Sequence, residues 1–482
     1  SGGGSGGRVA IVLTGAGSDF SSLWNGTNTA YGAAGGTAAA AGTVYRKTRE
    51  GTDALIIDNN GLATPGQIST FVTNAVNLNN FSNVVVNHNG VLGVRANTTV
   101  DFNTLNLTTY GPANSFIAID RDVNVTYPTD WQVKGYTLYV NAITPNKPVN
   151  LTIGTNGVLS HYQNLTAETY RMNLALAGNL TVLSNGTIKA DGIGYGIGQG
   201  PGAGAGLYGG AHGGGALGSA TALNPKTYGS IIAPTNIGSG GGACAGGGAI
   251  LLTVAGTTTV VAAGTISANS APSSGNGGGA GGSITLTTGW LAGNGTISAN
   301  GGSGNGGNTS GGGGGGRVAL ILTGTGADFS LWSGTNSAYG GPQPPVVAAA
   351  AGTVYRQKKD DLSGAGTVIV DNGATATNLA YTSLPAFTNS TEVIKQTTWA
   401  TANNARVGLV TNAAIAGLNL STNGVLELAN FSLTLKALTV TNKIYKSGIY
   451  GPHDTAVSRL TDSGISGKVI VKTGIGTTIS IW

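Results

Sequence analysis

The feature that most limits how this chain can fold is a strand-like run that follows a glycine tract at a constant interval. Ile250, Ile284 and Val318 lie 34 residues apart, each near the start of such a run. A second strand-like run, in which GTI precedes Lys or Ser, occurs at Gly186, Gly264 and Gly295. In each of these second runs the isoleucine has polar neighbours on both sides, which is the period-two alternation of a β-strand.

Short strands at constant spacing, without a helical pattern, predict an all-β fold of the parallel β-helix (β-solenoid) type. We expect a right-handed solenoid, because crossovers between parallel strands are right-handed. A coil needs fewer than 34 residues, so the glycine tracts should project as loops from one corner. We expect Gly238–Gly248, Ser274–Gly282 and Gly301–Gly316 to pack together, since residues without a Cβ permit close backbone approach. Flexible loops are the alternative, because ordering glycine costs much entropy.

A longer repeat sets the domain organisation. The segment Arg8–Asn28 matches Arg317–Asn336 almost residue for residue, and AAAAGTVYR occurs at both Ala38 and Ala348. The chain therefore divides into residues 1–110, a partial β-helix module; 111–150, divergent coils; and 151–482, a full module that repeats the first. We expect one continuous solenoid.

Composition narrows the possible functions. Only 9% of the residues are charged and 85 are glycine, whereas about a quarter of a typical soluble domain is charged. The net charge of +5 is spread along the chain, so we expect no nucleic-acid partner. The single cysteine, Cys244, excludes an intrachain disulfide and a paired-cysteine zinc site. No apolar run reaches the roughly 20 residues of a membrane span, and we expect neither a span nor a metal or cofactor.

The two ends of the sequence suggest self-assembly. Monomeric solenoids cover their exposed end strands with a helix or a polar coil, and neither RVAIVL after the first glycines nor GKVIVKTGIGTTISIW at the end reads as such a cap. We expect both ends to be open and to join copies of the chain head to tail, which builds a filament when the contact does not close. The predicted end residues are Val9, Ile11, Leu13, Ile479, Ile481 and Trp482.

The runs GGAILLTVAG, GTISAN, GGSITLTTG and GGRVALILTG resemble glycine-rich parallel β-helix proteins of the bacterial cell surface. The run LELANFSLTLKALTVTNKIYKSGIYGP resembles passenger repeats of autotransporter-type adhesins. The resemblance covers most of the chain, although Asn124–Tyr139 departs from it. It implies a surface or extracellular location, a scaffold or adhesive role, and no active-site residue. We therefore expect a non-enzymatic structural subunit of an extracellular filament, sheath or surface layer.

Two other functions stay open. A monomeric adhesin or glycan-binding domain would need exposed aromatic side chains in rows, with candidates at Trp24, Trp131, Trp332 and Tyr136; the repeat of Trp24 at Trp332 also fits a core position. A polysaccharide lyase or hydrolase would need clustered carboxylates, and the candidates are Asp120, Asp122 and Asp130.

Sequons suggest a further modification. Three of them follow the motif NGVL by seven or eight residues and would then share one face of the solenoid: Asn97, Asn164 and Asn430. They predict possible N-glycosylation sites, and hence a glycoprotein.

Overall fold

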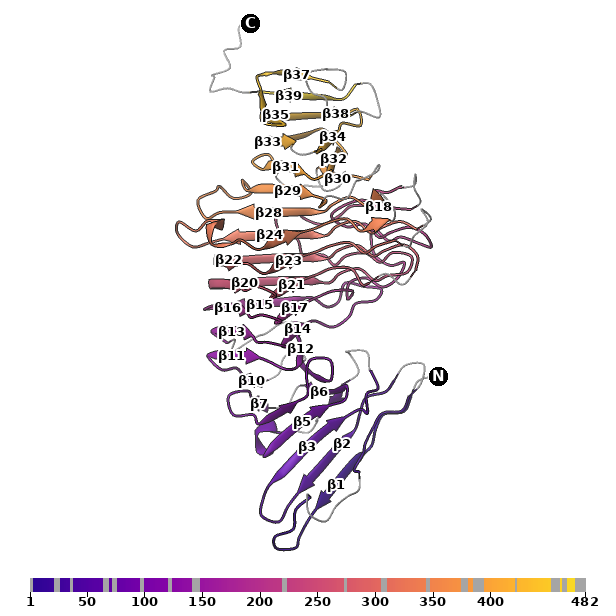
Figure 1. Ribbon diagram of the computed structural model, residues 1–482, viewed down its shortest axis with the longest axis vertical. Helices are drawn as coiled ribbons and strands as arrows, with labels where there is room; N and C mark the ends of the chain where they lie inside the picture. The colour runs from indigo at the N-terminus through magenta and orange to yellow at the C-terminus, as the bar shows by residue number, and fades with distance from the viewer. Residues whose placement is uncertain are drawn as a thin grey trace.

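The computed structural model describes residues 3–20, 27–34, 38–63, 69–71, 76–95, 99–119, 124–140, 148–218, 223–272, 275–304, 310–343, 347–373, 380–384, 394–420, 423–451, 460–461 and 466–472. Over these residues the chain is all-β, as predicted, with two short 3-10 helices, η1 (Leu78–Asn80) and η2 (Phe329–Leu331), and no α-helix. The body is elongated and its strands lie across the long axis (Figure 1).

Most strands pair in parallel and form two series of sheets along that axis. The first series has two sheets. The N-terminal sheet contains, in spatial order, β1 (Arg8–Val12), β2 (Thr43–Lys47), β3 (Asp53–Asp58), β5 (Asn83–Asn87) and β8 (Leu107–Thr109). The long sheet contains β11 (Asp130–Val133), β13 (Asn150–Ile153), β16 (Leu180–Val182), β20 (Ala249–Val260), β22 (Ser283–Gly293), β24 (Arg317–Leu322), β28 (Thr353–Gln357), β29 (Thr367–Asp371), β31 (Thr398–Ala402), β33 (Ala413–Leu420), β35 (Ser432–Val440), β39 (Lys468–Val471) and β37 (Gly448–Tyr450), with β15 (Met172–Leu176) and β36 (Lys443–Tyr445) beside this path.

The second series also has two sheets. Nine strands form one of them: β25 (Thr335–Ser337), β23 (Thr296–Ser298), β21 (Thr265–Ser267), β17 (Thr187–Lys189), β14 (Val158–Ser160), β12 (Thr137–Val140), β9 (Ser115–Ile119), β6 (Gly90–Val94) and β4 (Thr70–Phe71). Four form the other: β30 (Thr382–Leu384), β32 (Arg406–Leu409), β34 (Val425–Glu427) and β38 (Leu460–Thr461). Three strand pairs lie outside these sheets: β7 (Thr99–Asp101) with β10 (Asn124–Thr126), β18 (Ala216–Leu217) with β19 (Leu223–Asn224), and β26 (Pro342–Gln343) with β27 (Val347–Ala348). This arrangement is compatible with a β-solenoid.

The core consists of columns of aliphatic side chains in parallel register. Ile250, Ile284 and Val318 are direct partners in β20, β22 and β24, and all three are fully buried. The isoleucines of the GTI runs form a second buried column across β17, β21 and β23: Ile188, Ile266 and Ile297. The constant spacing in the sequence thus corresponds to stacking of equivalent side chains, which is how each strand covers the apolar face of the next.

The glycine tracts form an ordered bundle beside the sheets. We call it the glycine bundle; its described segments lie within residues 193–215, 238–248, 275–282, 299–304, 310–316, 338–342 and 348–352. The amides of Gly311 and Gly314 donate to the carbonyls of Leu207 and Gly210 in one neighbouring segment. The amide of the next residue, Gly315, donates instead to the carbonyl of Ala350 in another segment. Residues three positions apart therefore donate to the same neighbouring segment. This repeat of three matches the polyproline II helix, which has three residues per turn and no internal hydrogen bonds.

Close contact within the bundle confirms that the glycine tracts pack together. Gly278 and Gly281 donate to the carbonyls of Gly311 and Gly314. A Cβ on Gly313 would collide with the carbonyl of Gly279. The bundle also includes Gly194–Gly214, which the strand spacing had not placed there. Glycine is therefore required because backbones touch, and hydrogen bonds between segments offset the entropy of ordering it.

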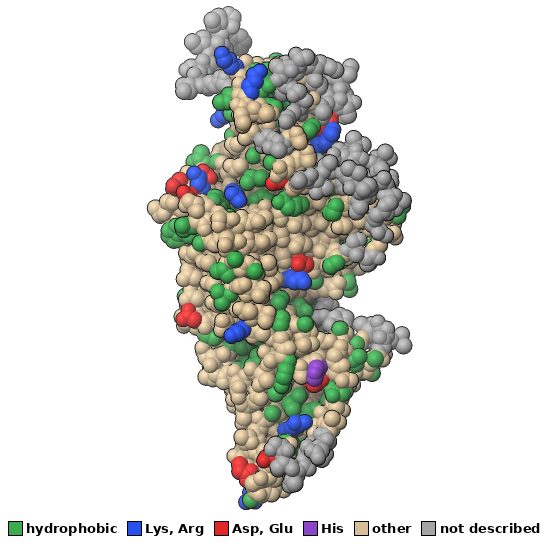
Figure 2. All heavy atoms as spheres, viewed as in Figure 1, with side chains coloured by type: hydrophobic (Ala, Val, Ile, Leu, Met, Phe, Trp, Pro, Cys, Tyr) green, Lys and Arg blue, Asp and Glu red, His purple; other side chains and the backbone are tan. Residues whose placement is uncertain are grey.

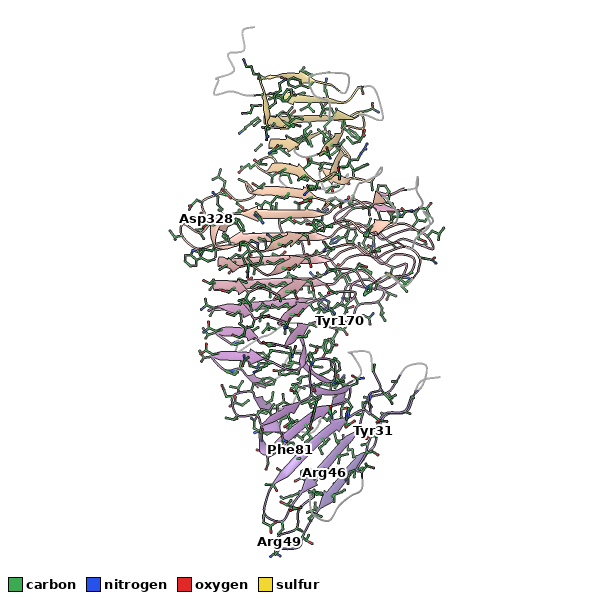
Figure 3. All side chains as sticks on the ribbon, viewed as in Figure 1. Tyr31, Arg46, Arg49, Phe81, Tyr170 and Asp328 are labelled. Carbon is green, nitrogen blue, oxygen red and sulfur yellow. The ribbon has the colours of Figure 1, made fainter. Side chains whose placement is uncertain are left out.

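The internal repeat extends to buried hydrogen bonds. Asn59 accepts from the amide of Gly32 and donates to the carbonyl of Ala39. Asn372, its counterpart, makes the same two bonds with Gly340 and Ala349. The Arg46 guanidinium, on the N-terminal sheet in Figure 3, lies 5.5 Å from the Phe20 ring centroid. Its counterpart Arg356 lies 5.2 Å from the Phe329 ring centroid.

Two features of the first sheet series differ from a regular stack of parallel coils. The strands β2 and β3 pair antiparallel, as do their counterparts β28 and β29. The ladder of hydrogen bonds is interrupted between β8 and β11, whereas the nine-stranded sheet continues past the interruption from β9 to β12. The N-terminal sheet is visibly splayed from the long sheet at this break (Figure 1).

Candidate assembly surface

The strand β1 forms the outer edge of the N-terminal sheet. It pairs in parallel with β2 on one side, and no described residue pairs with its other side. Three of the predicted end residues, Val9, Ile11 and Leu13, are only half-buried, and the side chain of Val12 is 54% exposed. An unpaired strand edge with aliphatic side chains is a template for another strand.

The internal repeat shows how such an edge becomes covered. The counterpart of β1 is β24, which pairs with β28 in the register that β1 has with β2. On its other side β24 pairs with β22, from Ser283↔Arg317 to Thr288↔Leu322. The counterparts of the half-buried residues are Val318, Leu320 and Leu322, and each is at most 1% exposed. No described residue thus covers β1 in the way that β22 covers its counterpart β24.

A ladder of glycines leads to the same conclusion. In the glycine-rich part of the chain, successive strands have a glycine directly before them, and a Cβ there would collide with the carbonyl of the corresponding glycine one coil earlier. This holds for Gly282 against Gly248, Gly316 against Gly282, and Gly352 against Gly316. In the N-terminal copy, Gly42 is placed in the same way against Gly7. At Gly7 the ladder stops, because a Cβ there would meet nothing within 4 Å.

Gly4 also differs from its counterpart in having no crowding neighbour, whereas Ser5 is not a glycine although its counterpart is. A Cβ on Gly4 would also meet nothing, whereas one on its counterpart Gly313 would collide with Gly279. Neither Gly4 nor Gly7 has a positive φ, so backbone conformation does not require glycine at these positions. At Ser5 the counterpart is Gly314, where a Cβ would collide with the carbonyl of Gly214, so the N-terminal copy carries a side chain where the second module requires glycine. The N-terminal copy keeps glycine at Gly4 and Gly7, whose counterparts are crowded by the preceding coil.

At the opposite end the outermost strand of the long sheet is β37, and no described residue pairs with its other edge. The strand β37 pairs antiparallel with β39, from Gly448↔Val471 to Tyr450↔Val469. The outer edge of β39 is thus occupied, because the chain turns back over its own sheet before that strand forms. The other predicted end residues, Ile479, Ile481 and Trp482, lie outside the described residues.

No protein-family model, curated protein or solved structure matches the chain. The chain's own second module is therefore the reference for interpreting the edge.

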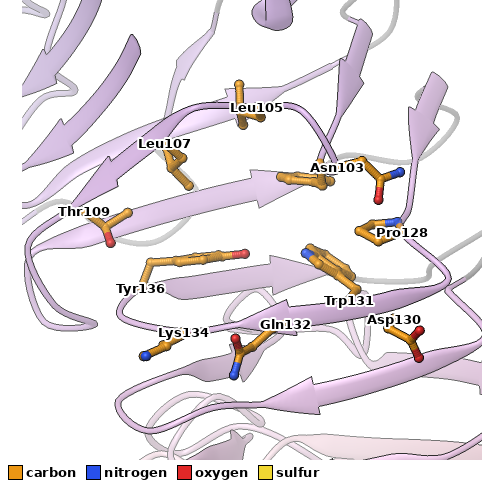
Figure 4. A pocket seen from close by; sticks show the side chains of 11 residues that line it. Asn103, Leu105, Leu107, Thr109, Pro128, Asp130, Trp131, Gln132, Lys134 and Tyr136 are labelled. Carbon is orange, nitrogen blue, oxygen red and sulfur yellow. The ribbon is translucent and has the colours of Figure 1, made fainter.

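The predicted acidic site is only partly described. Asp130 lies at the rim of a cavity of about 370 Å³ at the break between β8 and β11, and it accepts a hydrogen bond from Asn150 (Figure 4). Asp120 and Asp122 lie outside the described residues.

The aromatic candidates for glycan binding belong to the core. Trp131 and Tyr136, which border the same cavity, are 4% and 6% exposed, and Trp332 is 7% exposed. The Trp131 ring is stacked on Phe102, with 4.9 Å between centroids. Because sugars stack on exposed ring faces, these residues do not form a binding row; Trp24 lies outside the described residues.

The three sequons do not share one exposed face. Asn164 is 2% exposed, and its Nδ2 donates to the carbonyls of Tyr170 and Ile193. The folded chain therefore shields this asparagine from a glycosyltransferase, contrary to the prediction. Asn430 is exposed, and Asn97 lies outside the described residues.

Other site types find little support in the part of the chain that the structure describes. It contains no cluster of three or more His, Cys, Asp or Glu side chains suited to a metal ion. It also contains no helix long and apolar enough to cross a bilayer. Charged groups are scattered over the face in Figure 2.

Two buried histidines bond to backbone groups within the glycine bundle or where it meets β20, although the sequence had suggested no role for either. The Nδ1 of His161 lies 2.7 Å from the carbonyl oxygen of Tyr162, and its Nε2 accepts from the amide of Ala249, where β20 begins. The Nδ1 of His212 lies 2.8 Å from the carbonyl oxygen of Gly281. Burial lowers the pKa of His161 to about 4 and that of His212 to about 3. Both rings are therefore neutral at pH 7.

Acid is expected to weaken this junction. Below a pKa of about 6.5 the unfolded chain binds protons that folded His161 excludes, so stability falls as the pH drops from about 6.5 to about 4. The loss from His161 is about 3 kcal/mol at pH 4, at roughly 1.4 kcal/mol per pKa unit. Denaturation followed at a series of pH values should show a shallower decline for His161→Gln. The exposed His88 supplies the control, His88→Gln. An unchanged decline in His161→Gln would contradict the assignment.

Proposed function

We propose that this chain is a structural subunit of an extracellular filament, sheath or surface layer, and that copies assemble through the β1 edge. The proposal includes a right-handed β-solenoid with the glycine bundle at one corner. The observation that carries it is the open glycine ladder at Gly7 beside half-buried Val9 and Ile11. Their counterparts are buried by a preceding coil.

Several properties support a structural role in an exposed environment. The chain has one cysteine and one methionine, which limits oxidation, and Cys244 is buried. Much of the tertiary structure depends on backbone hydrogen bonds within the glycine bundle. The burial of Trp131, Trp332 and Tyr136 favours this function over glycan adhesion.

The direct test is negative-stain electron microscopy of the purified protein at several dilutions. We expect long unbranched fibres that persist on dilution. Ile11→Lys should abolish them, because it places a charge at an interface position whose counterpart, Leu320, is fully buried. Ile11→Val is the matched control and should still form fibres. Single rods of one subunit's length for the unaltered protein at every concentration would refute assembly.

A further inference from the structure

The β1 edge has a specific register and a specific requirement for its partner, which the second module defines. In that module β22 pairs with β24 with Ser283, Ile284 and Thr285 opposite Arg317, Val318 and Ala319. Two residues before β22 lies Gly281, where a Cβ would approach the amide nitrogen of Gly316. A partner for β1 therefore needs alternating inward aliphatic residues and a glycine two residues before its strand.

The same glycine requirement occurs throughout the bundle, so it is a rule of this stacking. A Cβ on Gly247 would approach the amide nitrogen of Gly282, and one on Gly315 that of Gly352. In the N-terminal copy Gly6 has this relation to Gly42. The strand β39 does not satisfy the rule, because Ser466 stands two residues before it, and β37 already occupies its outer edge.

One other segment of the chain does satisfy it. Residues 473–482, TGIGTTISIW, align without a gap with residues 278–287, GGAGGSITLT. The alignment places Ile479 and Ile481 at the inward positions of Ile284 and Leu286. It also places Gly476 at the position of Gly281. Building on the proposed function, we infer that residues 473–482 of a second copy pair with β1 as a parallel strand, with Ile479 opposite Val9 and Ile481 opposite Ile11.

The partner must be a second copy, because the segment cannot reach β1 of its own chain. Six residue steps lead from Lys472 to Thr478, and they span at most about 20 Å when extended. Eleven hydrogen-bonded steps separate β39 from β11, which is on the order of 50 Å at about 4.8 Å per step. The N-terminal sheet lies beyond β11 (Figure 1). The proposed pairing is therefore a strand exchange that links subunits in series.

Paired cysteines test the register. In the proposed pairing Ala10 lies opposite Ser480, about 4.8 Å away, within the range for a disulfide. Thr478 is displaced by two residues and lies about 8 Å from Ala10, beyond that range. Mild oxidation of Ala10→Cys/Ser480→Cys should give a ladder of covalent oligomers. Ala10→Cys/Thr478→Cys and the single variants should not, since the native Cys244 is 2% exposed.

The outcomes separate this inference from the proposed function. The register would be overturned, and assembly would stand, if fibres formed but Ala10→Cys/Ser480→Cys gave no ladder of covalent oligomers. An equal ladder from Ala10→Cys/Thr478→Cys would have the same meaning. Absence of both fibres and ladders in every variant and in the unaltered protein would overturn assembly itself.

A competition experiment uses the unaltered protein, in case the cysteine variants do not fold. A synthetic peptide of residues 473–482 should occupy β1 and shorten the fibres in proportion to its concentration. The same peptide with Gly476→Val should have no effect, because the added side chain meets the acceptor's backbone, and Ile475→Val is the matched active control. Equal inhibition by the Gly476→Val and unaltered peptides would contradict the glycine requirement, whereas fibres unaffected by any peptide would contradict the choice of donor segment.

Discussion

Replacing Gly7 by valine should raise the critical concentration for fibre formation and leave the isolated subunit intact. A Cβ at Gly7 meets nothing within the subunit, but one at its counterpart Gly316 collides with the carbonyl of Gly282 in the preceding coil. Overpacking of this kind costs about 1–3 kcal/mol, so the critical concentration should rise about 10- to 100-fold. Sedimentation of polymer measures this rise, and thermal denaturation measures the subunit.

A neighbouring residue provides the matched control. Ser5→Val adds bulk in the same segment, at a position that already carries a side chain, so fibres should form as before. Gly6→Val, unlike Gly7→Val, should destabilise the subunit itself, because its side chain would collide with the carbonyl of Ala30 in the same subunit. A Gly7→Val protein that polymerises at the original concentration would show that no coil stacks on β1.

Gly316→Val, the same substitution one module later, should destabilise the subunit itself. The valine would collide with Gly282 and disturb the donation from the Gly316 amide to Ala299. We expect a loss of about 3 kcal/mol or more, and amide hydrogen exchange should become fast throughout the glycine bundle. Unfolding melts and exchange rates of the same sample measure both effects.

The control for this prediction is Gly451→Val. A Cβ at Gly451 meets nothing and its φ is not positive, so the change should stay within about 0.5 kcal/mol. If Gly316→Val were equally mild, the bundle would contribute little to stability and its glycines would need another explanation.

The core columns could be predicted from the sequence because in-register stacking turns a constant spacing into direct contact. Ile250, Ile284 and Val318 needed only this rule. The antiparallel pair β2–β3 was missed although a signal was present. Only residues 48–52 separate the two strands, with Gly51 at φ 97°, and a parallel connection needs a dozen residues or more.

The candidate assembly surface was predicted in part, through Val9, Ile11 and Leu13. The sequence could not show which neighbouring atoms a side chain at each glycine would meet. These neighbours distinguish Gly6, which is crowded from within the subunit, from Gly7, which faces open space. The role of His161 was equally invisible, because its partner Ala249 is 88 residues away.

The break between β8 and β11 has a mechanical consequence. On one side of the body the hydrogen-bonded ladder stops there, and the aromatic side chains of Trp131 and Tyr136 border the cavity. On the other side the nine-stranded sheet continues without interruption. In a fibre of such subunits the continuous sheet would resist extension at this break while the interrupted side could open, so the fibre should bend there more easily in one direction than in the opposite one.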